Sequence, residues 1–226
     1  MRRIRISDIS MGHYLKLFGR SAMFLASLAL YLTGRLAEEL IRDFTAARVF
    51  ALFIWAVFII EMLMKYFPLG FESMGCQKQF AKNYIPTKNA NNVPEKDLRI
   101  YDRGALLILI FWILLNGIVA ILYFTHIIDR GILVLISLLY SVSDMICILF
   151  FCPFQTWFMK NKCCISCRIY TWDYILMFTP LLMIRNFFTC SLCITALGLM
   201  LRWEYIYRKH PERFSDRTNL SLHCSR

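Results

Sequence analysis

The chain has 226 residues, of which 58% are hydrophobic and only 18% are charged. Soluble domains are closer to half apolar and a quarter charged, so this composition excludes an ordinary soluble domain. The net charge of +11 does not indicate nucleic-acid binding, because the basic residues are spread over the loops, as in the cytoplasmic loops of membrane proteins. The apolar residues form long unbroken runs, which predicts an all-α, polytopic integral membrane protein of about five spans in the lipid bilayer.

The chain begins with a basic segment, residues 1–20, that leads into the first apolar run. Lys16 and Arg20 are four residues apart, so they share a helix face from which they can reach lipid headgroups. The apolar run is long enough to cross a bilayer only if its helix begins near residue 14, which predicts a first span over 14–33. No small-residue cleavage site follows, so we expect an uncleaved signal anchor in the plasma membrane with a cytoplasmic N-terminus.

The next three spans are separated by loops of different charge. The second is expected over 49–68, and the long polar loop that follows it, 69–103, is basic, which favours the cytoplasmic side. The third and fourth are expected over 104–125 and 131–151, joined by a tight outer turn. Together with the first and fifth runs they form the predicted helical membrane domain, residues 21–201.

The fifth apolar run, residues 174–201, is too long for one straight span and too short for two. Pro180 and the pair Arg185–Asn186 interrupt it. Two structures stay open: one tilted, kinked helix, which we favour, or a re-entrant hairpin that folds back at the interruption. The basic tail, 202–226, favours the cytoplasm, whereas five crossings from a cytoplasmic N-terminus would place it outside.

A few polar residues lie within the predicted spans at similar depths, as judged from the rise of about 1.5 Å per helical residue. Ionisable groups are rare at this depth unless they are paired or face water. Glu61 and Asp144, with Arg185 as their counter-charge, therefore predict a path for an ion, a proton or a transported substrate. The alternative is an Asp144–Arg185 pair that only fixes helix packing. The whole polar layer comprises Glu61, Asn116, Asp144, Arg185 and Asn186.

The loop before the fifth run carries Cys163, Cys164 and Cys167 in the pattern C-C-x-x-C. A C-x-x-C pair can place two thiolates on one metal ion, and zinc or another thiophilic metal would need further ligands, for which Cys76 and Cys224 are the candidates. Neighbouring basic residues are expected to lower the pKa of these thiols, which makes redox sensing the other interpretation. Acylation of juxtamembrane cysteines, or thiols without a role, are the alternatives.

A second C-x-x-C pair, Cys190 and Cys193, lies on one helix face within the fifth run. A membrane thiol–disulfide oxidoreductase uses such a pair, but it also needs shuttle cysteines on the outer face, where only Cys224 is a candidate. Two buried packing cysteines are the simpler expectation. The motifs G-x-x-x-x-G-K-[ST], G-x-G-x-x-G, H-E-x-x-H and G-x-S-x-G are absent from the sequence, so we do not expect an enzyme.

Three functions follow from these patterns, in order of preference. The first is a multi-pass membrane protein whose cysteine site on the cytoplasmic face binds a metal or senses redox state. The second is a small transporter, or an ion or proton pathway, through the layer of Glu61, Asp144 and Arg185. The third is an accessory subunit that packs against another membrane protein or against copies of itself.

Overall fold

The computed structural model describes residues 8–34, 46–68, 74–87, 95–159 and 167–222. These residues form helices and turns, and five of the helices are long and apolar enough to cross a membrane, as predicted. A helix satisfies all of its backbone hydrogen bonds within one segment, so it is the conformation that a single chain segment adopts in lipid. The long helices are α1 (Asp8–Leu32), α3 (Ala46–Tyr66), α5 (Glu95–Phe124), α6 (Arg130–Leu149) and α8 (Phe187–Lys209).

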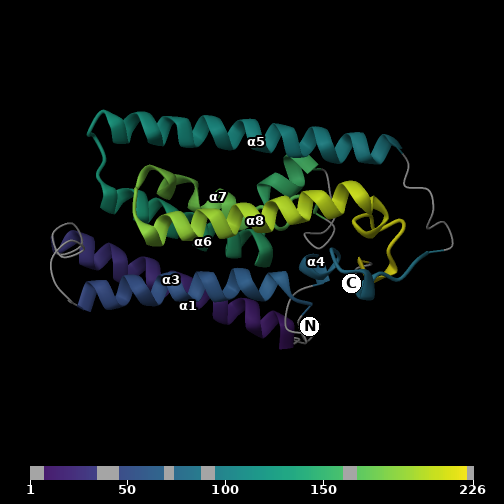
Figure 1. The fold of residues 1–226 in the computed structure, drawn as a ribbon, viewed down its shortest axis with the longest axis horizontal. Coiled ribbons are helices and arrows are strands. Elements are labelled where there is room, and N and C mark those ends of the chain that lie inside the picture. Colours follow the sequence, from purple (N-terminus) through teal and green to yellow (C-terminus); the bar gives the residue numbers. More distant parts are fainter. Residues whose placement is uncertain (1–7, 35–45, 69–73, 88–94, 160–166, 223–226) are drawn as a thin grey trace, which may run out of the picture.

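The long helices run side by side along one axis, with short helices between them (Figure 1). Helix α1 packs along α6, and α3 packs along α8. Asp129 caps α6 by accepting a hydrogen bond from the backbone of Ile132, and it also accepts one from the hydroxyl of Tyr31 at the end of α1. At the α3–α8 contact, a Cβ atom on Gly198 would lie 2.7 Å from the Tyr66 hydroxyl oxygen, so a larger residue there would displace the Tyr66 side chain.

The fifth apolar run does not form the single kinked helix that we favoured. It is divided into α7 (Asp173–Phe178), the 3-10 turn η4 (Thr179–Met183) and the start of α8, which continues past the run to Lys209. Together α7 and η4 rise only about 19 Å, short of the roughly 30 Å of a hydrocarbon core. We call α7 and η4 the half-helix, and it is the re-entrant alternative.

The half-helix lies antiparallel to α8, which changes the topology of the whole chain. Trp172, at its start, donates to Glu204 near the end of α8, whereas Cys193, in the first half of α8, donates to the carbonyl of Phe178. The half-helix therefore carries the chain toward one end of the bundle, and α8 brings it back. Figure 1 accordingly shows both termini at the same end, which we call the basal end. This removes the conflict between an odd number of crossings and a basic tail.

The tail is folded onto the basal end and is not a free basic appendage. The backbone of Leu220 donates to Ile85, and that of Thr87 donates to Thr218, beside a single β-bridge between Pro86 and Asn219. These contacts join the last described residues to the segment after α3.

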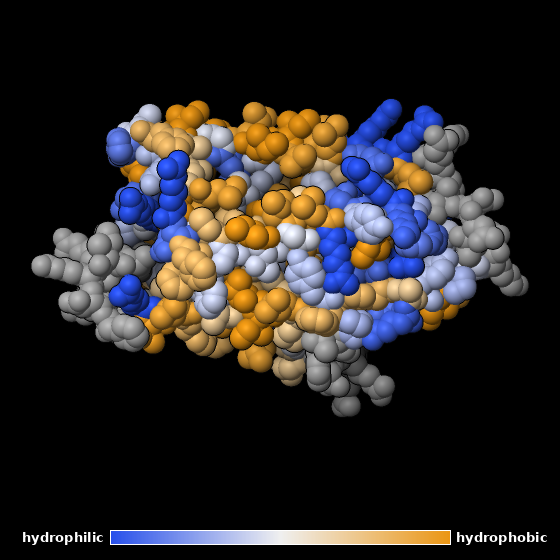
Figure 2. Space-filling view, viewed as in Figure 1, coloured by the Kyte–Doolittle hydropathy of each residue, from blue (hydrophilic) through white to orange (hydrophobic). Residues whose placement is uncertain are grey.

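The outer surface of the bundle has the polarity of a protein in a bilayer. Figure 2 shows hydrophobic side chains gathered over the middle of the bundle and hydrophilic ones at both ends. On α5, for example, Ile113, Leu114, Ile118 and Ile121 are exposed. A contiguous exposed apolar belt is unfavourable in water and is satisfied by lipid, so the chain is a multi-pass membrane protein.

Candidate functional site

Arg20 lies inside the bundle, in the middle of α1, where it joins two acidic residues from other helices. Its Nη2 donates to Glu61 on α3 at 2.8 Å, and its Nη1 donates to Asp144 on α6 at 3.0 Å. The Arg20 side chain is only 5% exposed, and the ring of Phe58 lies beneath its guanidinium. A planar guanidinium can hold two carboxylates at once in this way, whereas an ammonium group is a single point charge.

Glu61 has two further partners. The hydroxyl of Tyr174, on the half-helix, donates to the same oxygen that Arg20 contacts, at 3.0 Å. Lys16, one turn before Arg20, lies 3.8 Å from the other oxygen, and its side chain is 34% exposed. Three helices, α1, α3 and α7, therefore meet at one buried carboxylate.

The counter-charge of the polar layer is thus Arg20, whereas the sequence predicted Arg185 in this role. Arg185 and Asn186 are exposed in the turn between the half-helix and α8. Our depth for Arg185 assumed a continuous helix from Tyr174, and the break after η4 carries Arg185 beyond that helix. The sequence did hold a signal for Arg20, because a first span that begins near residue 14 necessarily includes it.

Asn116 is buried on α5, as expected of a polar group within a span, but it is not shown to join the charged network. Its side-chain nitrogen donates to the carbonyl of Trp112, one turn earlier on the same helix. Its side-chain oxygen has no hydrogen-bond partner among the described residues.

A second buried ion pair, which the sequence analysis missed, lies beside the first. Lys65 at the end of α3 donates to Asp173 at the start of α7, with 2.6 Å between Nζ and Oδ2. Their side chains are 8% and 7% exposed, and the Lys65 ammonium also lies 4.4 Å from the ring centroid of Tyr174. The other oxygen of Asp173, Oδ1, is buried without a hydrogen-bond partner among the described residues.

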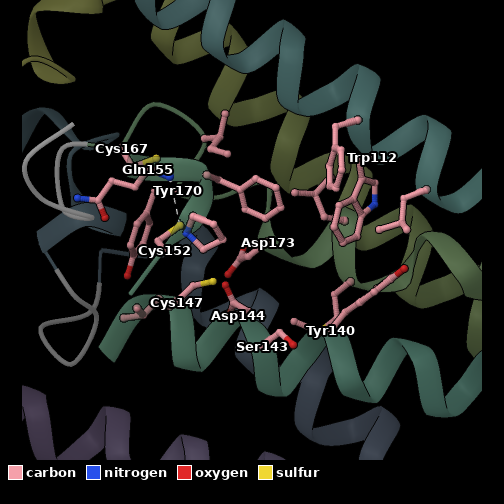
Figure 3. Close-up of a pocket in the computed structure, with 18 residues that line it drawn as sticks. Trp112, Tyr140, Ser143, Asp144, Cys147, Cys152, Gln155, Cys167, Tyr170 and Asp173 are labelled. Carbon is pink, nitrogen blue, oxygen red and sulfur yellow. Dashed lines mark hydrogen bonds between the residues drawn. The ribbon is translucent and has the colours of Figure 1, made fainter. Parts of the chain in front are cut away.

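The two ion pairs border a partly open cavity of about 310 Å³, which is lined by α5, α6, η2 (Phe154–Met159), α7 and the residues just before α7. Both Asp144 and Asp173 line it, and Figure 3 shows their carboxylates directed toward one another. The two groups repel electrostatically. We call this space the carboxylate cavity. The rest of its wall is largely apolar and aromatic, with the thiols of Cys147 and Cys152 at one side.

The charges of this network do not cancel within the buried part. Three carboxylates, those of Glu61, Asp144 and Asp173, meet two well-buried cations, Arg20 and Lys65, and the third cation, Lys16 beside Glu61, is 34% exposed. Two carboxylates that share a site are stabilised by a proton or a cation placed between them. The geometry therefore favours a positive guest in the carboxylate cavity.

The cysteine site of the sequence analysis is described only in part. Cys163, Cys164 and Cys224 lie outside the described residues, whereas Cys76 and Cys167 are buried. In the part of the chain that the structure covers, no group of three or more His, Cys, Asp or Glu side chains is arranged to hold a metal ion.

The expected activation of these thiols is wrong for Cys167. Burial raises the pKa of the Cys167 thiol to about 11, which outweighs the nearby ammonium of Lys78. The adjacent basic residue, Arg168, is paired with Glu204 instead. A thiol with this pKa is almost entirely protonated at neutral pH, so it is a poor nucleophile.

The second cysteine pair is divided between two environments. Cys193 is buried and donates weakly to the carbonyl of Phe178, whereas Cys190 is exposed on the first turn of α8. Cys193 therefore packs the half-helix against α8, as is usual for a buried cysteine.

Arg168 organises the basal end of the bundle. It makes a two-pronged ion pair with Glu204 on α8, and its guanidinium stacks on the ring of Tyr207, 3.8 Å from the centroid. Trp172 donates to the same carboxylate, and Trp203 donates to the backbone carbonyl of Arg168. Burial acts to lower the pKa of Arg168, but the hydrogen bonds and charge of Glu204 raise it above its usual value, so the Arg168 guanidinium stays protonated.

No protein-family model, curated protein or solved structure matches this chain. A helical membrane bundle is in any case a fold on which many functions occur, so fold class alone assigns none. The function therefore has to follow from the charged network and the carboxylate cavity.

Proposed function

We propose that this protein is a small membrane transporter or ion pathway that binds a proton or a monovalent cation between Asp144 and Asp173. The carboxylate cavity carries the proposal, because two carboxylates line the same partly open space within the bundle. Charged groups within a membrane are costly and commonly mark such pathways. This is the second of the functions expected from the sequence, with Asp173 and Arg20 in place of Arg185.

The network also has the properties of an element with two states. A positive guest between the two carboxylates competes with Arg20 for Asp144 and with Lys65 for Asp173. Each competition loosens a contact between helices: Arg20 connects α1 to α3 and α6, and Lys65 connects α3 to the half-helix. Binding of a cation is therefore coupled to helix packing, as alternating access requires.

We further propose that the basal end faces the cytoplasm of a cell-membrane protein. Basic residues gather at this end, as the positive-inside rule requires. They include Lys78, Lys82, Arg168, Arg202, Arg208, Lys209 and Arg213. Accessibility of single introduced cysteines from each side of the membrane measures this orientation.

Electrogenic currents from proteoliposomes on a solid support test the proposed function. A sudden rise in the concentration of protons, potassium or methylammonium should evoke a current with the wild-type protein. Asp144→Asn and Asp173→Asn each remove one negative charge from the cavity, and we expect the current to fall about tenfold or more, the usual scale for a lost charged contact.

Asp129→Asn is the matched control, because it makes the same substitution at the cap of α6, outside the cavity. Asparagine caps a helix as well as aspartate does, so this variant should retain the full current. Wild-type protein that gives no current above protein-free liposomes with any of the three cations would contradict the proposal. The chain would then behave as the accessory subunit that the sequence analysis kept as a third function.

A second candidate function is the metal site predicted from the cysteines, and one arrangement favours it. Helix α4 (Met74–Gln77), which carries Cys76, contacts η6 (Leu220–Leu222), two residues before Cys224. Lys78, next to α4, donates to the carbonyl of Cys167 at 2.6 Å. Two distant described parts of the chain, those that carry Cys76 and Cys167, therefore approach one another at the basal end, and a zinc site would need four ligands there.

Zinc content of the purified protein tests this candidate. We expect about one zinc per chain in the wild type, since a closed structural site holds its metal tightly through purification. Cys163→Ser and Cys167→Ser should each abolish it, and Cys190→Ser, on the exposed first turn of α8, should not. Wild-type protein without zinc would exclude the site.

A further inference from the structure

We propose that the guest of the carboxylate cavity is a small protonated organic amine with an apolar body, and not a bare metal ion. The inference rests on the proposed function, since it names the substrate class of the same site. It follows from the lining of the cavity, its volume and the one carboxylate oxygen that has no partner.

The aromatic wall is the first observation. Trp112 on α5 and Tyr140 on α6 are in contact, with ring centroids 4.7 Å apart and ring planes tilted by 57°, and the ring centroid of Phe154 lies 6.3 Å from that of Trp112. Figure 3 shows Trp112 and Tyr140 on one side of the two carboxylates. Aromatic side chains attract a cation that has shed its water, and the apolar body of the guest would pack against this aromatic wall.

The acidic end is the second observation. Asp173 is 7% exposed, and only its Oδ2 is occupied, by Lys65; its Oδ1 has no hydrogen-bond partner among the described residues although it is buried. A buried carboxylate oxygen without a partner is costly, and an ammonium N–H in the cavity would satisfy it. Asp144, on the facing wall, supplies the second negative charge.

The chemistry of the wall does not suit a divalent metal ion. A calcium or magnesium ion needs about six or more oxygen ligands, and two carboxylates among apolar rings do not provide them. Within the described residues, no cluster of three metal-ligating side chains is present. A cavity of about 310 Å³ is larger than a proton needs and falls in the range of small-molecule sites.

Calorimetry on the full chain in detergent micelles tests the inference with two probes of the same shape. Phenethylamine hydrochloride carries an ammonium group, and 2-phenylethanol carries a neutral hydroxyl in its place. We expect the amine to bind about tenfold or more tightly than the alcohol, the difference that a desolvated cation–π contact and a charged hydrogen bond provide.

Two tryptophan variants control for partition into the micelle. Leu115→Trp fills the cavity, whereas Leu114→Trp places the same side chain on the exposed face one residue earlier. Amine binding should be lost in the first and retained in the second. Asp173→Asn should weaken amine binding as well. If the Asp173→Asn variant unfolds because Lys65 loses its partner, the Leu115→Trp result still tests the inference.

Equal affinity for the amine and the alcohol, equal binding by the two tryptophan variants, or no binding of the amine would each overturn the inference. These outcomes are separate from those of the proposed function. Proton or potassium currents that depend on Asp144, without amine binding, would support the proposed ion pathway and contradict the organic guest. Amine binding in micelles without any current leaves the binding site and removes transport.

Discussion

Replacement of Arg20 by methionine should lower the free energy of unfolding by about 3–5 kcal/mol, the cost of leaving buried charges without their partner. The substitution keeps the apolar stem but strands Glu61 and Asp144 beside one another, with only Tyr174 and the partly exposed Lys16 left near Glu61. Titration of the purified protein with sodium dodecyl sulfate, followed by circular dichroism, measures the loss.

Arg185→Met is the matched control for this prediction. Arg185 is exposed in the turn before α8, so its replacement should change stability by less than about 0.5 kcal/mol, as is usual for surface positions. Arg20→Lys should lie between the two, because an ammonium group keeps the charge but does not bridge both acids equally well. Equal stability of Arg20→Met and Arg185→Met would show that Arg20 does not hold the helices together.

A double-mutant cycle identifies the interaction itself. Glu61→Gln in the Arg20→Met background removes the stranded charge, so the double variant should be more stable than the sum of the two single losses predicts. An additive result would mean that Arg20 stabilises the bundle through its packing on Phe58 and not through its ion pairs.

Replacement of Glu204 by alanine is expected to have the second largest effect, a loss of about 3 kcal/mol, at the low end for a broken buried pair. The Arg168 side chain, which is only 6% exposed, would then keep Asp102 as its acidic partner, with 3.6 Å between Arg168 Nε and Asp102 Oδ1. The indole N–H of Trp172 would also lose its acceptor. The same detergent titration measures this loss.

Glu212→Ala is the control for Glu204→Ala. Glu212 is also paired, with His210, but both side chains are about one-third exposed, and exposed pairs contribute little. We expect a change within about 0.5 kcal/mol for this variant. Comparable losses for the two substitutions would contradict a special role for Arg168 at the basal end.

Most of the fold was predictable from local sequence. The apolar runs that contain Glu61, Asn116 and Asp144 became spans close to the expected residues, because about 20 consecutive apolar residues are sufficient evidence for a helix in lipid. The break in the fifth run at Pro180 and Asn186 was visible too. What local sequence did not decide was the direction in which the chain continues after that break.

Of the residues of the candidate site, only the acids Glu61 and Asp144 were predictable from the sequence. Glu61 and Asp144 stand out because a charge inside an apolar run is rare, and composition reveals it. Lys65 and Asp173 lie at the edges of such runs, where charges are common, so their burial carried no local signal. Arg20 lies within the predicted first span, but we expected its side chain to reach the lipid headgroups and not the acids of other helices. The thiol of Cys167 was misjudged for the same reason, since sequence shows its basic neighbours but not its burial.

The sequence by itself determined that this protein is a bundle of membrane-spanning helices and which of those helices carry acids, because both properties depend on residues within one span. Only the tertiary structure decided which cation meets those acids and that two of them share a cavity. Arg20 and Asp144 are 124 residues apart, and the half-helix that carries Asp173 reaches the cavity only by folding back between α6 and α8. Such pairings depend on how helices face one another, and no single segment contains that information.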